Sequence, residues 1–161
     1  MMRPDGKLTF GGLGRASGVL THITSLPNDE GVGSLGQEAF DFIDQLALAG
    51  QRVWQILPLN PTQNDGSPYA ALSSFAGAEH VISLQRLTEQ GLLAADELAP
   101  LRALDARKID FAIALPLRRH LVALAASRFS ARADVRALAQ LAAFQAKAGP
   151  DWLDDYALFR A

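Results

Sequence analysis

The sequence predicts an α/β fold, and three segments in its first half support that prediction. Ser17–Leu26 and Arg52–Leu59 are apolar segments typical of strands, and between them apolar residues recur at helical spacing from residue 35 to Gly50. Strand, helix and strand in this order form a βαβ unit, whose strands run parallel through a right-handed crossover. Two strands do not complete a sheet, and His80–Leu84 offers only a short third one.

Capping and turn residues indicate where these elements begin and end. Ser34 with Gln37 three positions later resembles a capping box, which places the helix start near residue 35. Gly50 stands where a helix C-terminus favours a residue with positive φ. Pro58 and Pro61 end the second strand, because proline cannot donate to a sheet ladder.

Beyond residue 85 the sequence predicts helices, because alanine, leucine and arginine dominate and apolar residues recur at helical spacing. Pro116 lies inside one apolar-periodic segment, so that segment is either a kinked helix or two helices. The chain is therefore divided into a βαβ portion, residues 1–85, and a helical portion, residues 86–161, whose last helix has no stop signal. The helices are expected at Leu84–Glu89, from about Asp96, and at Ile109–Phe129, Ala133–Lys147 and Asp151–Ala161.

Composition excludes several classes of function. The 161-residue chain carries a formal charge of −2, which gives no basic field for nucleic acid or anionic lipid. It has no cysteine, hence no disulfide, thiolate metal site or cysteine nucleophile. Met1–Leu13 lacks the apolar centre of a signal peptide, and no segment approaches the roughly 20 apolar residues of a membrane span. We expect a cytoplasmic protein without metal or cofactor.

The glycine-rich segment Gly31–Gly36 formally matches the dinucleotide fingerprint G-x-G-x-x-G. In that fingerprint the first glycine follows the strand directly, but here four residues intervene, and Asp29 and Glu30 would place two carboxylates beside a phosphate. The second strand also lacks an acidic residue for the ribose at its end. A glycine-shaped βα loop is the favoured interpretation, and dinucleotide binding stays an alternative.

Carboxylate pairs and histidines give weaker indications of a site. The pairs Asp41 with Asp44, Asp96 with Glu97 and Asp154 with Asp155 lie on predicted helices, where a solvated face is the ordinary interpretation. The histidines are too scattered for a metal motif. His120 is expected on a helix surface, and His22, near the end of the first strand, is the one histidine with a possible role beside a site.

The strongest candidate is the polar, turn-forming segment Asn60–Tyr69, which directly follows the second strand. Parallel sheets collect their ligand groups at the carboxyl ends of their strands. Ser67 and Tyr69 flank a stiff proline, so a hydroxyl and a phenol are available to bind a polyol while the ring covers its apolar face. A plain surface loop is the alternative.

Taken in order, these segments resemble the amylomaltase family, the 4-α-glucanotransferases of glycoside hydrolase family 77. The similarity extends over nearly the whole chain at natural spacing. It is carried by Ser17–Pro27, Gly31–Gly36, Ala49–Leu59, Ser67–Tyr69, Ser74–Gly77, Gly91–Leu93, Ile109–Phe111 and Trp152–Phe159.

The resemblance implies the N-terminal part of a (β/α)8 TIM barrel, its first two strands, with a mostly helical insertion. It also implies transfer of α-1,4-glucan segments between maltooligosaccharides by a retaining double displacement. That mechanism uses an aspartate nucleophile, a glutamate acid/base and a second aspartate, all from later strands, so we expect this chain to be inactive alone. A TIM barrel needs at least about 200 residues, so 161 residues cannot close one.

The same resemblance assigns Ser67 and Tyr69 to the glucan cleft, where they bind sugars without transferring protons. Three positions depart from the family pattern. Asn64 stands where some members have a tyrosine of a secondary glucan site, Ala70 replaces a common glutamine, and Ser34 replaces a usual aspartate. A stand-alone glucan-binding or helical interaction module remains the alternative, and self-association of the open sheet is expected.

Overall fold

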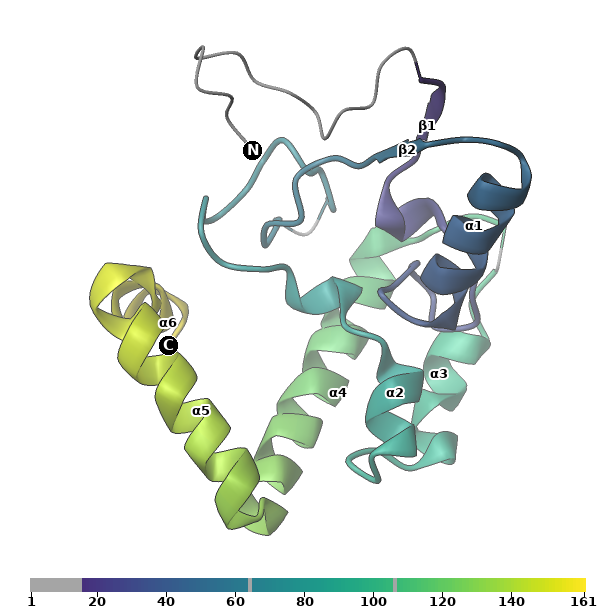
Figure 1. Ribbon diagram of the computed structural model, residues 1–161. Helices are drawn as coiled ribbons and strands as arrows, with labels where there is room; N and C mark the ends of the chain where they lie inside the picture. The colour runs from purple at the N-terminus through teal and green to yellow at the C-terminus, as the bar shows by residue number, and fades with distance from the viewer. Residues whose placement is uncertain (1–15, 64, 106) are drawn as a thin grey trace, which may run out of the picture.

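The computed structural model describes residues 16–63, 65–105 and 107–161 (Figure 1). The expectations for Met1–Leu13 and for Asn64 therefore lie outside the described residues. Two short strands come first, followed by helices and turns. In order these are β1 (Gly18–Leu20), the 3-10 turn η1 (Ile23–Ser25), α1 (Gln37–Leu48), β2 (Val53–Gln55), η2 (Glu79–Val81), α2 (Leu84–Glu89), η3 (Ala95–Leu98), α3 (Ala99–Arg102), α4 (Phe111–Arg132), α5 (Val135–Ala148), the π-helical turn η4 (Gly149–Leu153) and α6 (Asp154–Arg160).

The predicted βαβ unit is confirmed. β1 and β2 pair in parallel, with Val19 opposite Trp54, and α1 connects them. Gly50, at φ +70°, follows α1 in the left-handed conformation expected after a helix end. Both strands are shorter than predicted, and Leu20, the last residue of β1, is 59% exposed. The chain beyond Leu20 turns into η1 instead of extending the ladder.

Three further expectations are corrected. His80–Leu84 forms no strand; its first residues belong to η2 and its last begins α2. The capping box at Ser34 is wrong, because Gly36 is the N-cap of α1 and the Ser34 hydroxyl instead donates to Glu38 Oε1 at 2.6 Å. Pro116 lies inside the single helix α4, which begins at an Asp110 cap, so the two-helix alternative is wrong.

The main hydrophobic core joins residues from both sides of the predicted boundary at residue 85. α2, α3 and α4 pack together around it, and the loop before α1 covers one end (Figure 1). That boundary falls inside α2, and the division into two portions stays a prediction. The fully buried members are Val32, Leu84, Leu93, Leu98, Leu101, Ala114, Leu121 and Ala125.

α5 and α6 form a separate arm. α5 leaves the far end of α4 at a sharp angle, so that the two helices make a V (Figure 1). Asp134 caps α5 by accepting a hydrogen bond from Ala137 N at 2.8 Å. The arm returns to the rest of the chain through Arg160, whose Nη2 lies 3.3 Å from Glu79 Oε1. No described helix is long and apolar enough to cross a bilayer.

A buried ion pair fastens the loop before α1 to α4. Arg118 is 0% exposed, and its Nη1 lies 3.1 Å from Glu30 Oε2. The same guanidinium donates to the carbonyls of Glu30, His80 and Ile82 at 2.8, 2.9 and 2.6 Å. The Glu30 carboxylate also accepts from the backbone N–H of Leu84 and of the next residue, at 3.0 and 2.7 Å. Burial lowers the pKa of Arg118, and the charge of Glu30 opposes that shift.

A second ion pair fastens η3 to α4. Arg128 binds the Glu97 carboxylate with two nitrogens, each at 2.7 Å, and also donates to the Leu92 carbonyl at 3.1 Å. These hydrogen bonds, with one from Ala94 N, lower the pKa of Glu97 to about 2. Glu97 therefore has a structural partner, and it is not the free solvated carboxylate that the sequence suggested.

Candidate functional site

The segment after β2 forms an excursion whose two ends are tied together. Ala78 N donates to the Leu59 carbonyl at 2.9 Å, and Leu72 N donates to the Pro61 carbonyl at 2.8 Å. Between these bonds Thr62 forms an antiparallel bridge with Ala71. We call residues 60–78 the β2 loop. Most hydrogen bonds of its backbone join one part of the loop to another. They hold in place the turn at the far end of the loop, which we call the tip.

The tip of the β2 loop contains both residues predicted to contact a ligand. A tight turn shapes it: Ser67 N donates to Asp65 Oδ1 at 3.1 Å and Ala70 N donates to the Ser67 carbonyl at 3.1 Å. Tyr69 is 80% exposed, so its ring is not part of the core of the described chain. Ser67 is half-buried beside it. The structure thus presents a hydroxyl and an aromatic face on one turn.

Phe111, the first residue of α4, packs its ring against the backbone of this tip. Gly66 has φ +68°, and a Cβ added there would lie 2.5 Å from Cδ1 of the Phe111 ring. The ring therefore packs directly on the Gly66 backbone, which only glycine permits. Through this contact the position of α4 helps to set the position of Ser67 and Tyr69.

Gly66→Ala should lower the free energy of unfolding by about 1–2 kcal/mol, the usual cost of an L-residue in the left-handed region. It should also displace Phe111, because a methyl group has no space beneath the ring. Chemical denaturation measures the first effect. Gly77→Ala in the same loop is the matched control, since a Cβ there meets nothing within 4 Å. Equal stability of the two variants would contradict the packing described.

The carboxyl ends of β1 and β2 lie together, and His22 follows the end of β1. Thr21 N donates to the Gln55 carbonyl at 3.1 Å, which continues the parallel pairing by one residue. His22 follows directly, and its Nδ1 is buried without a hydrogen-bond partner in the described chain, as is Thr62 Oγ1. Burial lowers the pKa of His22, which favours the neutral imidazole. His22 thus lies at the expected edge, but its role beside a site stays a prediction.

Trp54 and His80 are packed within the fold, and His120 lies on its surface. The Trp54 indole N–H donates to the Thr21 carbonyl at 2.7 Å, and its ring meets Phe42 edge-on at 4.9 Å between centroids. His80 is buried, and desolvation lowers its pKa. His120 is exposed on α4, which confirms the sequence expectation. Within the described residues no three His, Asp or Glu side chains cluster as a metal site would require.

A carboxylate occupies the start of α1, where a dinucleotide phosphate would bind. Glu38 already occupies the start of α1, where its Oε1 accepts from Ser34 N at 3.0 Å and from the Asn28 side chain at 2.8 Å. Glu30, expected beside a phosphate, is turned inward to Arg118. A Cβ at Gly33 would overlap the carbonyl of Ile23. These contacts support the interpretation of a glycine-shaped loop.

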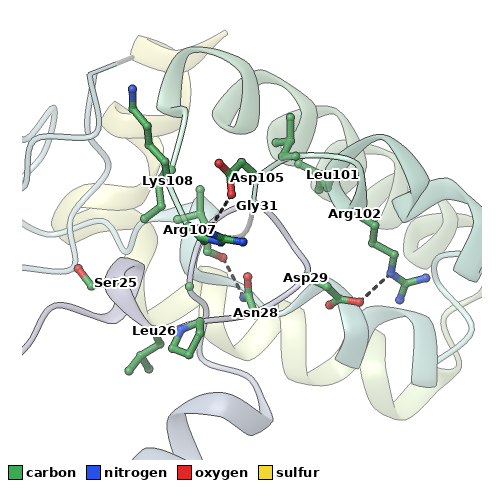
Figure 2. Close-up of a pocket in the computed structure, with 15 residues that line it drawn as sticks. Ser25, Leu26, Asn28, Asp29, Gly31, Leu101, Arg102, Asp105, Arg107 and Lys108 are labelled. Carbon is green, nitrogen blue, oxygen red and sulfur yellow. Dashed lines mark hydrogen bonds and ion pairs between the residues drawn. The ribbon is translucent and has the colours of Figure 1, made fainter.

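A cavity of about 480 Å³ lies between the loop after β1, which includes Gly31 and Gly33, and the turn after α3 (Figure 2). Asp29 and Arg102 close one side at 2.9 Å, and Asp105 accepts from Arg107 N at 2.8 Å. Of its charged side chains Asp29 and Arg102 form an ion pair, and its rim is exposed. None of the predicted ligand residues lines it, so we place the candidate site at the β2 loop.

The sequence analysis missed one exposed aromatic residue of this loop. Phe75 is 74% exposed, and the Ser73 hydroxyl fixes its backbone by accepting from Phe75 N at 3.2 Å and from Ala76 N at 3.1 Å. The signal was available in the sequence, because Phe75 is the one large aromatic in a segment of small residues outside any predicted strand or helix.

The fold and this loop define an α/β chain with a helical layer and an exposed aromatic ring and a hydroxyl at the carboxyl edge of a parallel strand pair. Comparison with known proteins shows the family. The sequence profile described as "4-alpha-glucanotransferase" matches residues 21–161. The chain is 43% identical over 148 residues to the 4-alpha-glucanotransferase of Streptococcus pneumoniae serotype 4, covering 91% of this chain and 28% of that protein. It is 38% identical over 149 residues to the Thermus thermophilus protein of that name, covering 92% and 29%.

A solved structure is similar as well. Amylomaltase from Streptococcus agalactiae, in complex with acarbose, superimposes with a TM-score of 0.82 at 38% identity, covering 91% of this chain and 29% of that one. The chain belongs to the 4-alpha-glucanotransferase family. It spans less than a third of the length of the relatives it matches.

Proposed function

We propose that this chain is the N-terminal part of a cytoplasmic 4-α-glucanotransferase, an enzyme that moves α-1,4-glucan segments between maltooligosaccharides with retention of configuration. In this proposal β1 and β2 are the first two strands of a (β/α)8 barrel, and the helices after the β2 loop are an insertion. The chain contributes glucan-binding residues, and the catalytic carboxylates come from later strands. No cofactor or metal takes part.

One observation carries the proposal: Tyr69 and Ser67 are displayed on a hydrogen-bonded loop at the carboxyl edge of a parallel strand pair, in a chain of this family. An exposed phenol beside a hydroxyl suits a sugar, because the ring covers the apolar face while the hydroxyls exchange hydrogen bonds. The acarbose held by the related amylomaltase is itself a carbohydrate analogue. His22 is proposed as a neighbour of this site.

The 161-residue chain should show no disproportionation of maltotriose, because in this proposal the nucleophile and the acid/base come from later strands. Retaining hydrolases hold the two carboxyls about 5–5.5 Å apart. Glu30 and Glu97, by contrast, are each committed to an arginine. Glucose release is measured with protein free of host enzymes, and the full-length protein is the positive control. Glucose formation by the short chain would refute the assignment of catalysis to later strands, and an inactive full-length protein would refute the proposed function.

The 161-residue chain is also expected to associate with itself. The strand pair has unpaired backbone edges, and Leu20 is 59% exposed beside them. Light scattering at micromolar concentration should report dimers or larger species, and Leu20→Lys should reduce them. Leu48→Lys, at an 81% exposed position on α1, is the control and should change little. A clean monomer for the unmodified chain would count against this expectation.

A further inference from the structure

The two sides of the β2 loop contain unequal lengths of chain. The loop leaves β2 through residues 59–62, the outgoing limb, and comes back through residues 71–78, the returning limb. Backbone hydrogen bonds join Leu59 to Ala78 at 2.9 Å and Pro61 to Leu72 at 2.8 Å. Between these bonds the outgoing limb contains residue 60 alone, whereas the returning limb contains residues 73–77, which we call the bulge. Among the described residues no backbone-to-backbone hydrogen bond joins the bulge to the outgoing limb.

Two side chains hold the bulge at Ala76. The Ser73 hydroxyl accepts from Ala76 N at 3.1 Å, and Asn60 Nδ2 donates to the Ala76 carbonyl at 3.1 Å. Ala76 is 3% exposed, so its backbone polar groups would be costly to leave without a partner. Ser73 belongs to the bulge itself. In the described part of the chain Asn60 is therefore the side chain that ties the bulge to the outgoing limb.

The Asn60 hydrogen bond lies next to the pairing that supports the tip. Beyond it the two limbs meet only at Pro61 with Leu72 and at the bridge of Thr62 with Ala71, among the residues described. A short two-stranded hairpin is marginally stable by itself in water. An additional hydrogen bond at the base of this pairing therefore fixes the returning limb, which begins directly after the tip.

We propose that Asn60 is a positioning residue for glucan binding: its hydrogen bond to Ala76 holds the returning limb in the register that presents Tyr69 to the sugar. Asn60 acts through Tyr69 and transfers no proton. An amide suits this position, because its N–H group donates to a carbonyl, whereas a carboxylate of the same shape only accepts. The inference rests on the glucan-binding role proposed above for Tyr69.

Steady-state kinetics of the full-length enzyme with maltotriose test this role. Asn60→Ala should raise KM about three- to tenfold, which corresponds to the loss of one hydrogen bond. Its kcat should be nearly unchanged, because the ground state and the transition state lose the same contact. Asn60→Asp should raise KM at least as much, since its carboxylate cannot donate to the Ala76 carbonyl. Ser73→Ala frees the N–H of Ala76 and should raise KM as well, which provides a second variant should Asn60→Ala fail to fold.

A double-mutant cycle separates positioning from a purely structural role. If Asn60 acts through Tyr69, Asn60→Ala should have little further effect on kcat/KM in a Tyr69→Ala background. Asn28→Ala is the matched control. It removes an amide that donates to the Val32 carbonyl at 2.9 Å in the loop after β1, and it should lower the melting temperature without changing KM. All kinetics are measured below the melting temperature of every variant.

Several results would overturn the role of Asn60. One is an unchanged KM in the Asn60 variants of an active enzyme, and another is an equal loss from Asn60→Ala with and without Tyr69. A rise in KM for Asn28→Ala as large as that for Asn60→Ala would also overturn it, because the effect would then follow stability alone. An inactive wild-type enzyme would refute the proposed function, and the role of Asn60 with it.

Discussion

Arg118→Ala should lower the free energy of unfolding by about 3–5 kcal/mol, the largest effect expected of a single substitution in this chain. The alanine leaves the Glu30 carboxylate buried without its counter-charge, since Glu30 is 2% exposed. It also removes the donors to the carbonyls of His80 and Ile82. Unpaired buried groups keep their full desolvation penalty. Urea denaturation followed by circular dichroism measures the loss.

The neighbouring ion pair supplies the matched control. Asp29 precedes Glu30 in the sequence and pairs with Arg102 at 2.9 Å, but both side chains are substantially exposed, at 65% and 35%. Arg102→Ala should therefore cost no more than about 1 kcal/mol. In a double variant, Glu30→Gln together with Arg118→Met should be more stable than Arg118→Ala, because the unpaired charge is gone. If Arg118→Ala and Arg102→Ala proved equally mild, the buried pair would have no structural importance.

Tyr69→Ala in the full-length enzyme should reduce kcat/KM roughly ten- to a hundredfold. The substitution removes a packing surface and a hydrogen bond to the glucan, each worth about 1 kcal/mol or somewhat more. Because Tyr69 is 80% exposed, the melting temperature should change little. Tyr69→Phe keeps the ring and loses only the hydroxyl, so its kcat/KM should lie between the values of the wild-type enzyme and Tyr69→Ala. Steady-state kinetics with maltotriose and thermal melting are measured for both variants.

If Tyr69 were instead a core residue of the full-length enzyme, the opposite results would be expected. Tyr69→Ala would then lower the melting temperature by several degrees, as expected for a loss of about 1 kcal/mol in stability. Tyr69→Phe would be nearly silent, and activity would fall only in proportion to unfolding. A stable Tyr69→Ala enzyme with unchanged kinetics would remove Tyr69 from the glucan cleft.

Local patterns in the sequence were sufficient to predict the βαβ unit and the helices. The apolar spacing of α1 and the glycine after it depend on residues close in the chain, and both predictions hold. The lengths of the strands could not be predicted from local patterns, because a strand extends only as far as its partner strand does. Leu20 and Gln55 end the paired segment, although apolar residues continue in the sequence beyond each of them.

Long-range contacts explain what the sequence left open in the site. Glu30 and Arg118 are 88 positions apart, and nothing local to Glu30 indicates that it is buried. The contact between Gly66 and Phe111 also joins residues far apart in the sequence, so the support of the tip was not foreseen. The polar turn at Ser67–Tyr69 was predicted because proline and glycine set turns locally. The exposure of Tyr69 and of Phe75 depends on how the whole chain packs, so local patterns did not predict it.

The hydrogen bonds that close the β2 loop have a consequence for the order of folding during synthesis. Leu59 with Ala78, Pro61 with Leu72 and Thr62 with Ala71 are all pairs fewer than 20 residues apart. Closing so short a loop costs little chain entropy. Domains form from the N-terminal end as the ribosome adds residues, at about 5–20 per second. The loop that displays Tyr69 can therefore close on the nascent chain as soon as residue 78 has left the exit tunnel, while α4 is still being translated.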